Sequence, residues 1–238
     1  MISEERLDAS LRELGEADIP VPDVGDELAN ELEQMHSARP RSPGRELLLL
    51  ALVSLMYVGT LLGALRFRPD LTALPRLWLI TYVAAWGLSF LALAYVVLVP
   101  AKGRIIPNWR LGLLLGLGAE VGFIVAGLFL ARSVPGVSHV YPATIEDLAA
   151  HGYHCLTLGV ITALVPAALG VVFLRGAVPV GDRSAAAALG AAGGCLGGMM
   201  LHLHCPISGY LHLGLIHGGV VILASLLTAL IAPRFLSP

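Results

Sequence analysis

Six apolar runs, each about 20 residues long and bounded by charged residues or proline, most constrain what this chain can fold into. Crossing the roughly 30 Å hydrocarbon core of a bilayer takes about 20 apolar residues in a helix. Only 13% of the 238 residues are charged, whereas about 25% are charged in an ordinary soluble domain. The sequence therefore predicts an all-α, polytopic membrane protein with six transmembrane helices, at approximately residues 47–65, 77–99, 111–131, 155–174, 185–204 and 211–232.

Arginine and lysine residues flank these runs unevenly. The cytoplasmic flanks of membrane helices retain positive charge, so the side with more Lys and Arg faces the cytoplasm. One side holds Arg39, Arg41, Arg45, Lys102, Arg104, Arg110, Arg175, Arg183 and Arg234, and the other holds Arg66, Arg68, Arg76 and Arg132. This pattern predicts that both termini are cytoplasmic.

The first 45 residues differ in composition from the rest of the chain. They hold 11 Asp and Glu but 5 Lys and Arg, a net charge of −6, whereas residues 46–238 carry +4. Helical spacing of apolar residues predicts two short amphipathic helices, with stripes at Leu7, Leu11 and Leu14 and at Val24, Leu28 and Leu32. Helices this short are marginal alone in water, so the stripes are expected to order on a partner. A solvated tail that merely precedes the first span is the alternative.

Histidines and cysteines gather at the predicted non-cytoplasmic ends of the last three runs. His154 and Cys155 begin the fourth run. His204 and Cys205 end the fifth run, and His217 lies early in the sixth. Imidazole and thiolate suit Zn, Cu or Fe, so these five residues are candidate metal ligands. Redox sensing by Cys155 and Cys205 is a second interpretation, and histidines that only hydrogen-bond at helix ends are a third.

Other residues within the runs favour structural roles. Glu120 lies midway along the third run and is predicted to face the bundle interior, because an unpaired carboxylate in lipid is costly. Pro166 is expected to kink the fourth helix. Cys195 is expected to be a small packing residue. Helix packing is also predicted for the small-residue stripe of Gly190, Gly194 and Gly198.

No motif for an enzyme is present. The chain has no phosphate-binding loop, nucleophile elbow or metalloprotease helix. We therefore predict a protein that is not an enzyme and needs no cofactor, unless a metal ion occupies the outer His/Cys cluster. The alternative class is a membrane redox or metal-handling protein that binds haem, copper or a quinone at that cluster.

The C-terminal third resembles the NrsF-type membrane anti-sigma factors. The resemblance rests on His204-Cys205-Pro206, on His217-Gly218 and on Cys155 at the start of the fourth run. The overall plan is also similar to that of the carotenoid-regulating anti-sigma factors of myxobacteria. The resemblance implies a six-span protein of a bacterial inner membrane, whose cytoplasmic N-terminal segment holds an extracytoplasmic-function (ECF) sigma factor inactive.

This resemblance agrees with the division of the chain into two parts. Residues 1–45 would form a sigma-binding tail, and residues 46–238 the six-helix domain in the lipid bilayer. An acidic tail suits a sigma factor, whose DNA-facing and polymerase-facing surfaces are partly basic. The expected partner is therefore an ECF-type sigma factor, with no direct contact to nucleic acid. An envelope, redox or metal signal at the outer His/Cys cluster would release it.

Overall fold

Long antiparallel helices make up the part of the chain that the computed structural model describes: residues 25, 41–99, 109–133, 145–175, 183–207 and 211–236. Side chains are described within these ranges except at 109, 124, 126–133, 145–151 and 236. The elements are α3 (Pro43–Leu65), α4 (Arg76–Leu98), α5 (Trp109–Ser133), α6 (Ile145–Leu174), α7 (Arg183–His204), the π-helix η1 (His212–His217), α8 (Gly219–Ile231) and α9 (Pro233–Leu236). These ranges contain no strand, which agrees with the predicted all-α class.

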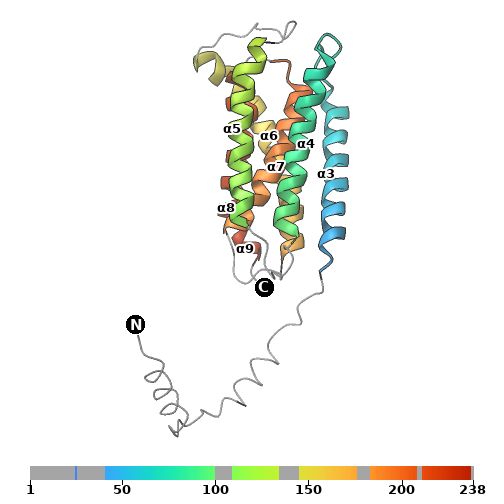
Figure 1. The fold of residues 1–238 in the computed structure, drawn as a ribbon, viewed down its shortest axis with the longest axis vertical. Coiled ribbons are helices and arrows are strands. Elements are labelled where there is room, and N and C mark those ends of the chain that lie inside the picture. Colours follow the sequence, from blue (N-terminus) through green and yellow to red (C-terminus); the bar gives the residue numbers. More distant parts are fainter. Residues whose placement is uncertain are drawn as a thin grey trace, which may run out of the picture. The chain divides into compact units, whose positions relative to one another are not determined.

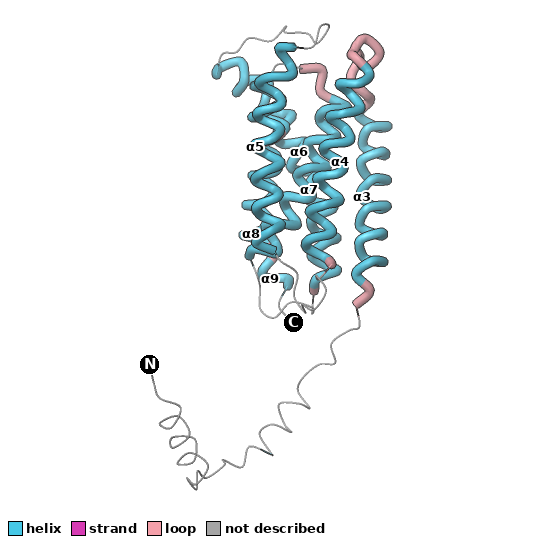
Figure 2. Tube along the Cα trace, viewed as in Figure 1, coloured by secondary structure: helices cyan, strands magenta, loops and turns pink. Residues whose placement is uncertain are grey.

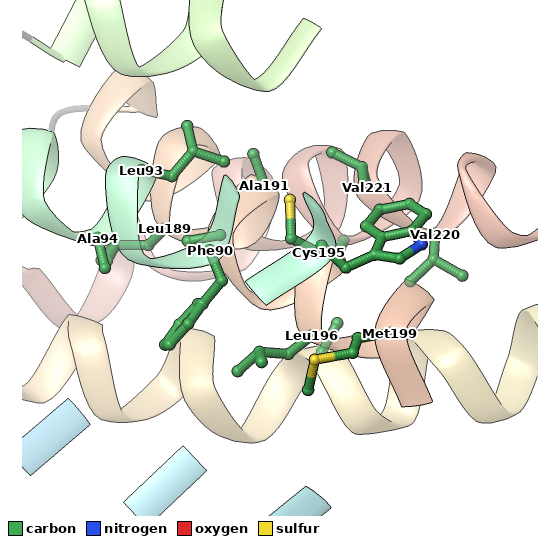
Figure 3. Close-up of a cluster of buried hydrophobic side chains, with 14 of the residues drawn as sticks. Phe90, Leu93, Ala94, Leu189, Ala191, Cys195, Leu196, Met199, Val220 and Val221 are labelled. Atoms are coloured by element: carbon green, nitrogen blue, oxygen red, sulfur yellow. The ribbon is translucent and has the colours of Figure 1, made fainter. Parts of the chain in front are cut away.

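Helix α7 forms the centre of the bundle, with the other long helices around it (Figures 1 and 2). Nearly every residue between Ala185 and His202 is buried, although most are alanine or glycine. Figure 3 shows Cys195 of α7 among larger apolar side chains that include Phe90 and Val221. Cys195 is fully buried, which confirms its predicted packing role.

Two glycine stripes let the neighbouring helices approach α7. A Cβ atom on Gly194 would lie 2.5 Å from the Cα of Val221 in α8. Gly190 faces α8 as well, and Gly193 and Gly197 meet the backbone of α6. A Cβ on Gly198 would lie 2.7 Å from the ring of Trp86 in α4. The predicted packing stripe of Gly190, Gly194 and Gly198 is confirmed. The structure adds a second glycine face on α7, which packs against α6.

Five helices in the described ranges are long and apolar enough to cross a membrane: Pro43–Leu65, Arg76–Leu98, Gly152–Leu174, Arg183–His204 and His212–Ile231. Large apolar side chains on their outer faces are exposed, for example Met56 and Leu77, as expected for surfaces in contact with lipid. The chain is thus a multi-pass membrane protein. The further span expected at 111–131 coincides with α5, and its crossing of the membrane stays a prediction.

Three other predictions from the sequence concern Glu120, Pro166 and the N-terminal stripes. Glu120 is buried inside the bundle, as predicted. Helix α6 continues without a break through Pro166, and the predicted kink there stays a prediction. The amphipathic stripes at Leu7–Leu14 and Val24–Leu32 lie outside the described residues, in the unit Met1–Ala38 that is separate from Arg39–Pro238.

Candidate functional site

Two thiols and one imidazole meet at the end of the bundle where α7 finishes. Cys155 lies in the membrane-spanning part of α6, Cys205 follows the last residue of α7, and His212 is the first residue of η1. The Sγ atoms of Cys155 and Cys205 are 3.3 Å apart. The Nε2 atom of His212 lies 3.5 Å from the Sγ of Cys205. Three segments that are distant in sequence therefore form one cluster, which we call the thiol–imidazole site.

The thiol–imidazole site has two chemical capabilities. Its three ligand atoms all lie within 4.8 Å of one another, close enough to share a metal ion, and thiolate with imidazole suits Zn and Cu(I). The two cysteines are free thiols, so they can also be oxidised to a disulfide. The hydrogen bond with Cys155 and burial raise the pKa of the Cys205 thiol. Cys155, which is only half-buried, is thus the thiol that an oxidant reaches more easily.

The π-helix η1 positions His212 within the predicted sixth span. The amide of Gly218 donates to the carbonyl of Leu213, five residues earlier, at 3.3 Å. This wider turn is a geometry that often occurs at functional sites. It places the His212 and His217 rings edge to face, with centroids 5.2 Å apart. Two histidines of the same helix therefore extend from the thiols into the bundle.

Arg68 fastens the α3–α4 loop to the end of α7. Its guanidinium donates to the carbonyls of His202 and Pro206 at 3.3 and 3.0 Å. Its backbone amide donates to the carbonyl of Leu203 at 3.0 Å. A cation is favourable at this negative end of a helix dipole. The Arg68 side chain is thus a clamp on both sides of Cys205.

Asp70 completes the Arg68 clamp. Two nitrogens of Arg68 donate to the Asp70 carboxylate at 2.7 and 2.8 Å, a bidentate pair. This hydrogen bonding holds the pKa of the Asp70 carboxyl below its usual value. The backbone next to Arg68 also holds the α3–α4 loop against the end of α7, because His204 Nδ1 lies 2.8 Å from the carbonyl oxygen of Arg66. Arg66 has a positive φ of 71°, and this turn directs its carbonyl toward α7.

Two buried histidines lack polar partners in the described part of the chain. Neither ring nitrogen of His202 or of His217 has a hydrogen bond there. The His202 ring instead stacks on Tyr82, at a centroid distance of 5.0 Å and an angle of 11°, and packs against Trp78. Glu120 lies near the junction of η1 and α8, where a Cβ on Gly218 would be 2.6 Å from its Oε1. The interior behind the thiol–imidazole site is therefore unusually polar.

The structure separates the five predicted ligands. Cys155 and Cys205 are brought together, and His217 lies behind His212. His154 is exposed at the helix surface, and His204 uses its Nδ1 on the Arg66 carbonyl. His212, which sequence reasoning left out of the ligand set, takes the place next to Cys205. The available signals were its position at the start of the sixth run and its spacing of seven residues from Cys205, which matches no standard ligand motif.

Fold and site together define a multi-pass helical membrane protein with a thiol–imidazole site at one end of its bundle. The chain belongs to the family described as negative regulator of sigma F (NrsF), whose sequence profile it matches over residues 28–237. No curated protein and no solved structure gives a significant match. The family confirms the resemblance carried by His204-Cys205-Pro206. It also makes the chain a negative regulator of a sigma factor, which is a regulatory role.

Proposed function

We propose that this protein is a membrane-bound anti-sigma factor that sequesters an ECF-type sigma factor through residues 1–45. The main support for this proposal is the extent of the family match, which begins at residue 28 and continues through the whole bundle. The shared sequence thus includes Leu28 and Leu32 of the second amphipathic stripe as well as the helices. The acidic charge of this segment favours a partner with basic surfaces.

We further propose six spans with both termini in the cytoplasm of a bacterial inner membrane. The starts of α3, α5 and α7 lie at one end of the bundle with the ends of α4, α6 and α8 (Figure 1). Basic residues at this end of the described part are Arg41, Arg45, Arg110, Arg175, Arg183 and Arg234. At the opposite end, Arg66 and Arg76 are exposed, whereas Arg68 is buried and paired with Asp70. This excess of basic residues supports a cytoplasmic location for the end at which α3 begins and α8 ends.

Release is proposed to start at the thiol–imidazole site. Oxidation would join the Cys155 and Cys205 sulfurs, with two electrons and two protons passing to the oxidant. The Sγ–Sγ distance of 3.3 Å would shorten to about 2.05 Å. Because α6 and the end of α7 would move together, the change would pass along the bundle to the cytoplasmic ends. A switch of this kind must bias two states by a few kcal/mol.

Alanine at Leu7, Leu11, Leu28 and Leu32 together should abolish sequestration. Burying each leucine contributes about 1.5–3 kcal/mol, so losing four should weaken sigma binding at least about 100-fold. The sigma regulon should then be expressed without any stimulus. Co-purification of the sigma factor with the full-length protein, together with a reporter of the regulon, measures this.

A matched variant carries alanine at Asn30 and Gln34, which lie off the second stripe by helical spacing. This variant should bind the sigma factor like the wild type. Continued repression by the leucine variant at normal expression would refute the stripe as the binding surface.

Serine at both Cys155 and Cys205 should change the response to oxidant or metal. Serine keeps the size of the side chain but cannot form the disulfide or supply a soft ligand. Induction of the regulon should fall to the uninduced level, while repression without stimulus is retained. Cys195→Ala is the control, because this thiol packs in the core, and its induction should persist. An unchanged response in the double variant would reduce the pair to a packing role.

The thiol–imidazole site also supports a second function, a membrane redox or metal-handling protein. Its supporting observation is the compact set of Cys155, Cys205 and His212. That function requires stoichiometric metal, haem or quinone in the purified protein and no sigma factor bound to residues 1–45. Elemental analysis and the co-purification experiment separate the two.

A further inference from the structure

A groove runs between α6 and the α8–α9 segment, away from the thiol–imidazole site. Its volume is about 400 Å³, within the range of ligand sites. Leu164 and Val172 form part of the α6 wall, and Ile231 and Phe235 form part of the opposite wall. All four side chains are among the exposed large hydrophobic residues. An apolar groove within membrane-spanning helices opens toward lipid rather than water.

Positive charge marks one end of this groove. Arg175, the first residue after α6, is the only charged side chain among its lining residues. Arg234 lies beside the groove in α9, next to Phe235. Both arginines are exposed, and in the described part of the chain neither forms an ion pair. The groove therefore favours an occupant that is apolar along its length and anionic at one end.

We propose that this groove binds an anionic phospholipid, with an acyl chain between α6 and α8 and the phosphate on Arg175. The charge complementarity selects this occupant, because basic residues at a membrane surface attract anionic headgroups. The same helices carry Cys155 on α6 and adjoin His212 through η1. A lipid in the groove thus lies between α6 and α8 at one end of the bundle. The opposite ends of these two helices adjoin the thiol–imidazole site.

The test compares phosphatidylglycerol with phosphatidylcholine on the full-length protein by native mass spectrometry and thermal unfolding in detergent. The wild type should retain phosphatidylglycerol preferentially and gain thermal stability from it. Arg175→Gln should weaken this binding about fivefold, the effect of about one basic residue at the headgroup level. Ala168→Phe, which fills the apolar part of the groove, should remove the bound lipid. Arg45→Gln is the matched control, because Arg45 lies at the same end of the bundle but does not line the groove.

Three results would overturn the proposal. Equal retention of the two lipids would exclude recognition of the headgroup charge. Equal losses in Arg45→Gln and Arg175→Gln would mean diffuse attraction to the whole basic end. A dimer that Ala168→Phe converts to a monomer, without a change in bound lipid, would assign the groove to a second copy of this chain. Because the lipid measurement needs no sigma factor, its failure is distinguishable from failure of the proposed function.

Discussion

Gly194→Ala should destabilise the bundle by about 2–3 kcal/mol, the cost of overpacking a tightly packed core. The new methyl group would lie 2.5 Å from the Cα of Val221, so α7 and α8 would have to separate. A backbone atom cannot rotate away as a side chain can. Reversible unfolding of the purified protein in mixed micelles, and its abundance in membranes, measure the effect.

Gly59→Ala provides the matched control for this prediction. Gly59 lies within α3, and a Cβ there would meet no atom within 4 Å. Alanine favours a helix over glycine by up to about 1 kcal/mol, so this variant should be unchanged or slightly more stable. Equal stability of the two variants would show that α7 and α8 do not approach at Gly194.

Arg68→Met should loosen the end of the bundle that carries the thiol–imidazole site. The substitution keeps an unbranched side chain but leaves the carbonyls of His202 and Pro206 without their charged donor. It also leaves the Asp70 carboxylate without its partner. Each buried group that loses its hydrogen bond costs about 1–3 kcal/mol, and we expect a total loss of about 2–4 kcal/mol. Without the clamp, the buried thiol of Cys205 should become more accessible, so that a maleimide reagent labels it faster than in the wild type.

Arg76→Met is the control for the Arg68 clamp. Arg76 begins α4 at the same end of the bundle, but it is exposed. Its replacement should leave both the unfolding free energy and the rate of Cys205 labelling near the wild-type values. Similar labelling rates in the two variants would show that the clamp does not position Cys205.

Sequence patterns predicted the membrane-spanning helices better than the residues of the thiol–imidazole site. Five of the six predicted runs coincide with helices suited to cross a membrane, because the thickness of the bilayer dictates both length and apolarity. The pairing of Cys155 with Cys205 was one of the open interpretations, and the structure places their sulfurs in contact. Arg68 was counted only as an orientation signal. Its role as a clamp depends on carbonyls such as that of His202, 134 residues further along the chain, and no local pattern records such a contact.

The sequence by itself determined that the chain is a helical membrane protein with an acidic N-terminal segment and an NrsF-like C-terminal third. Apolar length, charge placement and short motifs are properties of the linear chain, so they are readable without a fold. The tertiary structure alone decided that His212, rather than His154 or His204, lies beside the thiols. It did so because the wide turn of η1 and the close packing of glycine faces on α7 set which side chains converge, and both depend on contacts between helices.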